Sequence, residues 1–145
     1  KSLYKTAMAV PDELYEVPLG VAKQVQSGDD LTIIAIGRMV DVAKEVANNL
    51  SYDIEIMDPV TLSPLDIDSL AASAKKTGRV LILSEATQQS GISAEIFAQL
   101  IEAGFDGKIS RLGAKFMPIS AAKSVELGQI PTQADIMQAI DTLLS

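Results

Sequence analysis

Two near-continuous apolar runs of strand length constrain the fold of this chain more than any other feature. Residues 31–36 (LTIIAI) and 80–83 (VLIL) are both bounded by polar residues or glycine. Such runs are typical of strands that are covered on both faces, as in parallel sheets. Between and after them, apolar residues recur at helical spacing in four segments, 40–50, 64–76, 93–103 and 132–144. Strands that alternate with helices predict an α/β fold with a largely parallel sheet and helices on both faces.

Three weaker signals complete the predicted sheet. Residues 54–57 alternate apolar and acidic side chains, which predicts a strand with one covered face. Residues 21–26 are short and polar, as expected of an edge strand, and residues 108–112 can form a last short strand.

The stretch 54–66 (IEIMDPVTLSPLD) combines a strand, a breaker and a helix start. Pro59 should end the strand because proline has no backbone N–H for the ladder. Ser63 can cap the following helix, Pro64 fits its first position, and Asp66 stands three residues after the cap. We therefore expect a helix from Pro64 to Lys76.

Composition excludes several kinds of chemistry. The chain has 145 residues, which fits one domain, and it contains neither histidine nor cysteine. Ser-His-Asp triads, cysteine nucleophiles and zinc sites built on imidazole or thiolate are therefore excluded. A net charge of −7 argues against nucleic acid and anionic membranes as partners. No apolar run approaches the ~20 residues of a membrane span, and the first residues lack a signal-peptide pattern. We expect the cytosol or an organelle matrix.

Three residues follow predicted strands, where open α/β sheets bind ligands. Gly37 lacks the further glycines of a phosphate loop, so a tight turn is the simpler interpretation. Asp58 fits a turn or an interface. Glu85 can act as an acid or base only if it is desolvated, and it otherwise anchors the next loop. Two acidic pairs, Asp29–Asp30 and Asp66–Asp68, each stand at the start of a predicted element. Acidic residues at such positions interact favourably with a helix dipole, and this is a simpler interpretation than metal binding. By residue chemistry alone, the chain is a domain without its own active site.

Several strings, in this order and spacing, resemble one family. They are LYEVPLG (14–20), AKQVQSGDDLTIIAIGRMV (22–40), IEIMDPVTLSPLD (54–66), KKTGRVLILSEA (75–86) and SGISAEIFAQLIEAGF (90–105). The chain is similar to the C-terminal, transketolase-like domain of the beta subunit of thiamine-diphosphate-dependent 2-oxo acid dehydrogenases. This group includes the pyruvate, branched-chain and acetoin enzymes. The resemblance implies that residues 1–16 are a connector from an upstream pyrimidine-binding domain and that residues 17–145 form the domain itself.

The resemblance also implies a fold and a function. The fold is a three-layer α/β/α domain with a five-stranded, mostly parallel sheet whose first strand is antiparallel at the edge. The full enzyme oxidatively decarboxylates a 2-oxo acid, pyruvate foremost, and acylates a lipoyl acyltransferase. Thiamine diphosphate and magnesium would lie between the alpha subunit and the upstream beta domain, with no cofactor bound by this chain.

The implied partners are a second beta subunit, the alpha subunit and the subunit-binding domain of the acyltransferase. The expected subunit interface comprises Asp58, Thr61, Leu62, Ser63, Pro64, Ile96 and Phe97. The expected acyltransferase docking residues are Glu126, Asp135, Asp141 and Ser145. Self-association is expected through the apolar helix 93–103, and Glu85 is the only catalytic candidate.

Two departures leave the substrate open. Many relatives carry His-Glu where this chain has Ser84-Glu85, and the loop 87–91 lacks their Gly-Gly pair. The equivalent domain of a transketolase or a deoxyxylulose-phosphate synthase is one alternative, although the TLSPLD string argues against it. A free-standing flavodoxin-like binding module is another, and its phosphate loop should be visible in the sequence.

Overall fold

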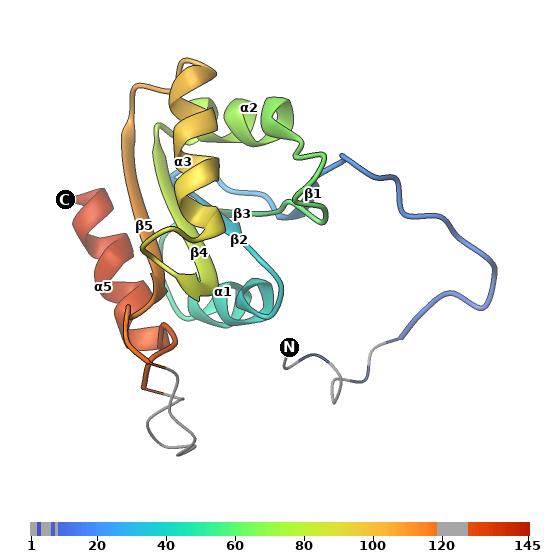
Figure 1. Ribbon diagram of the computed structural model, residues 1–145, viewed down its shortest axis with the longest axis horizontal. Coiled ribbons are helices and arrows are strands. Elements are labelled where there is room, and N and C mark those ends of the chain that lie inside the picture. Colours follow the sequence, from blue (N-terminus) through green and yellow to red (C-terminus); the bar gives the residue numbers. More distant parts are fainter. Residues whose placement is uncertain (1–2, 4–6, 8, 119–127) are drawn as a thin grey trace.

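The computed structural model describes residues 3, 7, 9–118 and 128–145 and contains one five-stranded sheet (Figure 1). The strand order is β1-β3-β2-β4-β5. β1 runs antiparallel to β3, and the other neighbours are parallel. The predicted mixed sheet with an antiparallel edge strand is therefore confirmed. The strands are β1 (Lys23–Gln26), β2 (Leu31–Ala35), β3 (Ile54–Asp58), β4 (Arg79–Thr87) and β5 (Lys108–Ala114).

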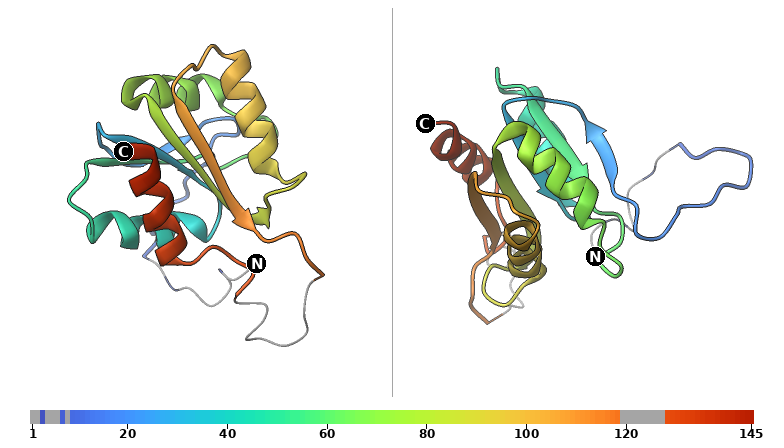
Figure 2. Two further views of the ribbon diagram at one scale, coloured as in Figure 1. Left: turned by 90° about the vertical axis from the view of Figure 1, so that its left-hand side faces the viewer. Right: turned by 90° about the horizontal axis from the view of Figure 1, so that it is seen from above.

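Helices cover both faces of the sheet, which confirms the three-layer α/β/α architecture (Figure 2). α1 and α5 pack on one face, and α2 and α3 pack on the other. The described helices are α1 (Met39–Asn48), α2 (Ile67–Thr77), α3 (Ile92–Glu102) and α5 (Gln133–Leu144).

The two apolar runs form the centre of the sheet, as predicted. All five residues of β2 are buried, and its side chains alternate between the two faces. Ile33 packs with α1 and α5, whereas Ile34 packs with α2 and α3. β2 supplies side chains to two helical layers, and four of its five residues are apolar, which is why this pattern was readable from the sequence.

β3 differs from the prediction of a half-covered strand. Its first four residues are all buried, and Glu55 is only 2% exposed. The alternating pattern was misleading because the acidic side chain does not face solvent. It faces α2, whose polar side chains bind it.

The start of α2 also differs from the prediction. α2 begins at Ile67 rather than Pro64, and its cap is Asp66, whose Oδ1 accepts from the Ser69 N–H at 3.2 Å. Ser63 and Pro64 belong to the crossing before the helix. The helix ends at Thr77, one residue beyond the expected Lys76, where Gly78 caps it in the left-handed conformation at φ 68°.

β4 is longer than the apolar run that predicted it. It extends from Arg79 to Thr87, and its pairing with β5 has an irregularity between Leu83 and Thr87. Glu85 therefore lies within the strand, not in the loop that follows it. In this extension Ser84 is still buried, whereas Glu85, Ala86 and Thr87 are partly or largely exposed.

The spacing of Thr132 and Asp135 predicts a capping pair at the start of the last helix, and α5 carries this pair in full. The Thr132 Oγ1 accepts from the Asp135 N–H, and the Asp135 carboxylate accepts from the Thr132 N–H at 2.9 Å. Hydrogen bonds from the Thr132 hydroxyl and backbone hold the pKa of Asp135 below its ordinary value. The helical pattern predicts a core face of Ile136, Met137, Ile140 and Leu143. Ile136, Ile140 and Leu143 are buried in the core, but Met137 is 38% exposed.

Replacing Thr132 by alanine should destabilise the domain by about 1 kcal/mol, because one N-terminal amide of α5 loses its cap. Urea unfolding followed by circular dichroism measures the change. Thr142→Ala is the matched control, since its exposed hydroxyl only bonds back to the Gln138 carbonyl within the helix. Equal losses in the two variants would contradict a capping role for Thr132.

Candidate functional site

The crossing between β3 and α2 contains a tight turn centred on Val60. Val60 has a φ of 60°, and the Thr61 N–H donates to the Pro59 carbonyl at 2.6 Å. The Val60 N–H donates to Asp58 Oδ1 at 2.9 Å. A positive φ is strained for a β-branched residue, and a γ-turn of this hand is rare. Asp58 therefore serves the turn, as one of its two sequence interpretations proposed.

Thr61 fastens the segment that precedes β1 to this crossing. Its Oγ1 accepts from the Gly20 N–H at 2.9 Å and donates to the Pro64 carbonyl at 2.8 Å. A Cβ at Gly20 would lie 2.9 Å from Pro64 Cγ, and Gly20 has a φ of 72°, so glycine suits this position on both counts.

Asp66 adds a second fastening point. Its Oδ2 accepts from the Ala22 N–H at 2.8 Å while its Oδ1 caps α2. The bond from Ala22 is the main reason that the pKa of Asp66 lies below its ordinary value, and the bonds from Ser69 act in the same direction. The helix cap and the docking of the N-terminal segment thus depend on one carboxylate.

These contacts gather exposed apolar side chains from two parts of the chain. Leu19 and Val21 flank Gly20, and Val60 and Leu62 flank Thr61. All four are between 41% and 75% exposed. We call these four residues the crossing patch. Among the predicted interface residues of the crossing, Leu62, Ser63 and Pro64 are exposed, whereas Asp58 and Thr61 are occupied by internal hydrogen bonds.

α3 does not present the predicted apolar pair to the outside. Ile96 is fully buried in the core cluster between α2, α3 and the sheet, so it is not available to a partner. Phe97 is half-buried, with the Arg111 guanidinium 5.8 Å from its ring centre. The exposed apolar residue of this helix is Ile101, at 46%. Several sides of α3 are apolar, and the sequence did not indicate which side faces inward.

Glu85 forms an ion pair at the carboxyl end of the sheet. Its Oε1 lies 3.6 Å from Arg38 Nε, and both side chains are partly exposed. A general acid or base near neutral pH requires a desolvated carboxylate, and Glu85 does not meet that requirement here. The pair links the β2–α1 turn to β4 rather than anchoring the loop that follows β4.

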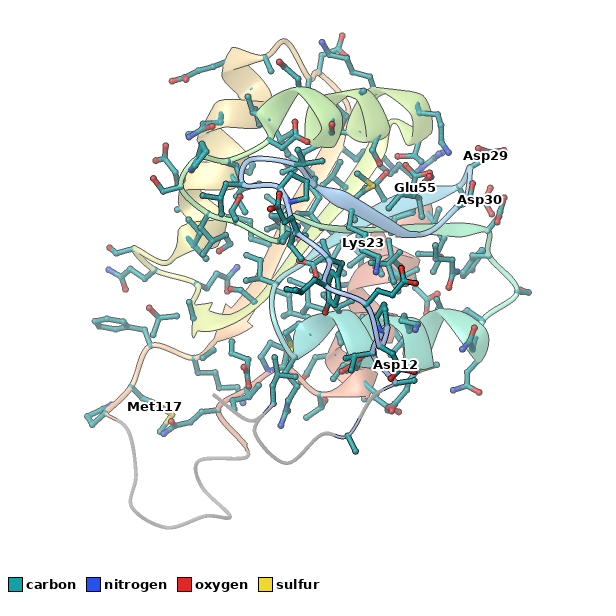
Figure 3. The ribbon with its side chains drawn as sticks, turned by 90° about the vertical axis from the view of Figure 1, so that its right-hand side faces the viewer. Asp12, Lys23, Asp29, Asp30, Glu55 and Met117 are labelled. Carbon is teal, nitrogen blue, oxygen red and sulfur yellow. The ribbon has the colours of Figure 1, made fainter. Side chains whose placement is uncertain are left out.

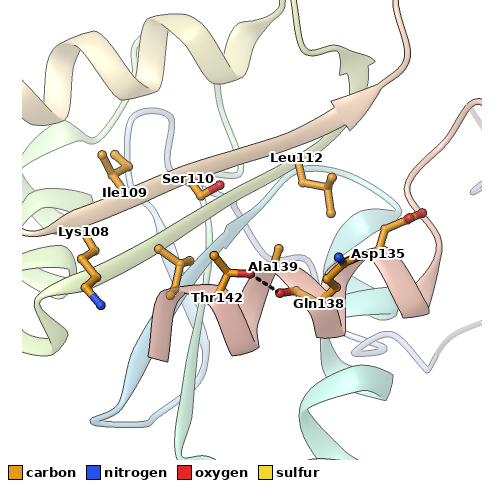
Figure 4. Close-up of a pocket in the computed structure, with 9 residues that line it drawn as sticks. Lys108, Ile109, Ser110, Leu112, Asp135, Gln138, Ala139 and Thr142 are labelled. Carbon is orange, nitrogen blue, oxygen red and sulfur yellow. Dashed lines mark hydrogen bonds between the residues drawn. The ribbon is translucent and has the colours of Figure 1, made fainter. Parts of the chain in front are cut away.

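A groove runs between β5 and α5 on the face that carries the predicted docking residues (Figure 4). Asp135, Gln138 and Thr142 line its α5 side, and Lys108, Ser110 and Leu112 line its β5 side. Asp141 and Ser145 are exposed near the end of the same helix. Glu126 lies outside the described residues.

Sequence reasoning missed the most heavily bonded carboxylate of the described structure. Glu55 accepts hydrogen bonds from Gln24 Nε2 at 2.9 Å, from Lys76 Nζ at 2.5 Å and from the Ser73 hydroxyl. Lys76 also lies 3.2 Å from Asp29 Oδ1. Burial alone would raise the pKa of Glu55, but these hydrogen bonds outweigh it and hold the pKa below its ordinary value of 4.5.

This carboxylate joins three elements at one corner of the domain, where Figure 3 shows Glu55 near Asp29 and Asp30. Gln24 comes from β1, Glu55 from β3, and Ser73 and Lys76 from α2. The Ser73 hydroxyl continues the network to Thr32 Oγ1 at 3.0 Å. In the sequence, Glu55 is an acidic residue between two isoleucines. That pattern is as compatible with an exposed acidic side chain as with a buried one.

The described residues contain no group of three or more carboxylate, imidazole or thiolate side chains placed to hold a metal ion. Within the same part of the chain, no helix is long and apolar enough to cross a membrane. The candidate site therefore consists of exposed surfaces and of carboxylates that hold neighbouring elements together.

The fold is that of an α/β domain with helices on both faces of a mostly parallel, five-stranded sheet. The chain belongs to the transketolase C-terminal domain family, whose model matches residues 20–136. This confirms the family inferred from the sequence strings.

Two relatives show how this domain is used elsewhere. The beta subunit of acetoin:2,6-dichlorophenolindophenol oxidoreductase from Bacillus subtilis is 35% identical over 99% of this chain and 44% of its own length. The beta subunit of the pyruvate dehydrogenase E1 component from Porphyra purpurea is 36% identical over 99% of this chain and 45% of its own length. The chain thus spans less than half of these relatives, and both are subunits of oxidoreductases.

A solved structure has the same fold. It is described as a split gene transketolase, an inactive beta4 tetramer, and matches with a TM-score of 0.78 and 23% identity. The match covers 96% of this chain and 45% of that chain.

Proposed function

We propose that this chain is the assembly and docking domain of the beta subunit of a 2-oxo acid dehydrogenase. The full enzyme would oxidatively decarboxylate a 2-oxo acid, pyruvate foremost, in the cytosol or an organelle matrix, and acylate a lipoyl acyltransferase. Two beta-subunit relatives that align over 99% of the chain support this proposal. Residues 9–18, which extend away from the sheet in Figure 1, fit the proposed connector to an upstream domain.

The cofactor belongs to the full enzyme in this proposal. Thiamine diphosphate needs a divalent metal bridging its phosphates to the protein, and the described residues offer no acidic cluster for one. The carboxylates of Asp58, Asp66 and Glu55 already accept internal hydrogen bonds. The residues present therefore do not fit the cofactor, and an alpha subunit and the upstream beta domain would hold it.

The α5 surface is the proposed docking site for the basic subunit-binding domain of the acyltransferase. The single observation that carries this is the exposed acidic end of α5 beside an open groove. A change at Asp135 would affect helix stability as well as docking, because its carboxylate completes the capping box of α5. Asp141, which is exposed, is thus the cleaner probe of docking.

Asp141→Asn should weaken binding of a basic subunit-binding domain several-fold and reduce its salt dependence, because one charge pair is lost. Isothermal titration calorimetry at two salt concentrations measures both effects. Asp68→Asn makes the same charge change on α2, on the opposite face of the sheet, and should leave binding unchanged. If both variants bind like the wild-type chain, the docking site is not on α5.

A further inference from the structure

We propose that the free edge of β5 binds an extended, acidic segment of a partner protein, which adds to the sheet as a further strand. The proposal is independent of the docking proposed above. That docking depends on the exposed end of α5 and on Asp141, which does not line the groove beside β5.

β5 ends the sheet on the side opposite β1, and its outer side carries backbone groups that no other described strand pairs with. The Lys108 N–H donates to the Gly78 carbonyl at 3.1 Å, so this residue turns its backbone to β4. Because successive residues of a strand turn their backbone groups to opposite sides, those of Ile109 and Arg111 point away from β4. The Arg111 carbonyl accepts from Gln88 Nε2 at 2.7 Å. The Arg111 N–H and both backbone groups of Ile109 therefore remain for a partner.

Two helices border this edge, and Figure 2 shows β5 between α5 and α3. The groove on the α5 side is lined by Ser110 from the strand and by Gln138 and Thr142 from the helix (Figure 4). On the other side, α3 carries the half-buried Phe97 and, one turn further on, Ile101, which is 46% exposed. An added strand would place alternate side chains in the groove and against α3. Backbone pairing combined with pockets for alternate side chains is how sheet edges recognise extended peptides.

The charges along β5 favour an acidic partner. Residues 107–118 contain Lys108, Arg111 and Lys115 but no acidic residue, although the chain has a net charge of −7. Arg111 is also held in place, because its Nη1 donates to the Gln88 carbonyl at 2.9 Å and its guanidinium lies over the Phe97 ring. A cation that is already ordered loses less conformational entropy when it binds a carboxylate.

The same cations argue against other occupants of the edge. Charged residues on an edge strand guard it against unwanted pairing. If the β5 edges of two copies paired, Lys108 and Arg111 of one copy would meet the same cations of the other. The acidic residues of segment 9–18 lie on the β1 side of the same domain, away from β5 (Figure 1). The edge therefore suits an acidic segment of another protein.

Fluorescence anisotropy with a labelled peptide of alternating valine and glutamate tests the proposal on the full 145-residue chain. The peptide should bind, and Lys108→Gln and Arg111→Gln should each weaken binding about fivefold, because one charge pair is lost. Lys23→Gln is the matched control, since it removes an exposed lysine from β1, the opposite edge strand, and should leave binding unchanged.

A second peptide separates strand addition from simple charge attraction. It has the same sequence but is methylated at alternate backbone nitrogens, so it keeps its carboxylates and loses its donors along one edge. Its affinity should be at least tenfold lower. Hydrogen exchange gives a direct readout, because the first peptide should slow exchange of the Ile109 and Arg111 amides about tenfold. The Lys108 amide, which is already bonded to Gly78, should change much less.

Three results would each overturn the proposal. The first is no binding of the unmethylated peptide, or equal binding of the methylated one. The second is a loss in Lys23→Gln as large as that in Lys108→Gln. The third is protection of the Ile109 amide that grows with protein concentration when no peptide is present, because a second copy would then occupy the edge.

Discussion

Glu55→Ala is expected to destabilise the domain by about 3 kcal/mol, the upper range for removing a buried, hydrogen-bonded carboxylate. The change removes the acceptor of Gln24, Ser73 and Lys76 together. Ser73 is only 7% exposed, and without Glu55 its hydroxyl keeps Thr32 Oγ1 as its remaining side-chain partner. Urea unfolding at neutral pH measures the loss.

Glu55→Gln separates charge from hydrogen bonding. The amide keeps the size of the side chain and one acceptor oxygen but loses the ion pair with Lys76, so its cost should be smaller. The stabilisation by Glu55 should also depend on pH in a defined direction. Because the folded pKa of Glu55 is below 4.5, its contribution is present above that value and is lost as the pH falls through the folded pKa. A stability gap between wild type and Glu55→Gln that persists unchanged in strong acid would contradict this account.

Gly28→Ala is expected to cost roughly 3 kcal/mol or more, because the new methyl group meets backbone that cannot rotate away. A Cβ at Gly28 would lie 2.3 Å from the Ile54 carbonyl carbon and 2.5 Å from the Glu55 nitrogen. The β1–β2 turn would have to move away from β3, and this would loosen the pairing of both edge and central strands. Thermal and urea unfolding measure the loss.

Gly37→Ala provides the comparison for Gly28. Gly37 has a φ of 61°, but nothing lies within 4 Å of a Cβ built there. Its replacement should cost about 1 kcal/mol, the penalty of a left-handed conformation alone. If the two substitutions cost the same, the close approach of Gly28 to β3 is not what requires glycine.

Features governed by local pattern could be predicted from the sequence. The apolar runs became β2 and β4 because strands buried on two faces are mostly apolar, with Thr32 as a hydrogen-bonded exception in β2. The capping box of α5 was readable because Thr132 and Asp135 satisfy each other within one turn. The family strings added the antiparallel edge strand, which no periodicity in residues 21–26 indicated.

Features governed by distant contacts could not be predicted. Glu55 is buried because Gln24 and Lys76, which stand 31 and 21 positions away, reach it. Asp66 replaced Ser63 as the helix cap because its carboxylate also holds Ala22, 44 positions away. The inward side of α3 depends on how that helix rests on β4 and β5, and so Ile96 and Ile101 could not be told apart.

The strand order has a consequence for how the domain opens and closes. β1 precedes β2 in the chain but pairs only with β3, so its docking surface exists only after residues 31–58 have come together. With four residues and an irregular register, β1 is also the shortest strand of the described sheet. It is therefore the strand best suited to detach in partial unfolding while the parallel strands stay paired. Because Glu55 is bonded to β1 through Gln24, such an excursion would admit more water to a carboxylate that is otherwise only 2% exposed.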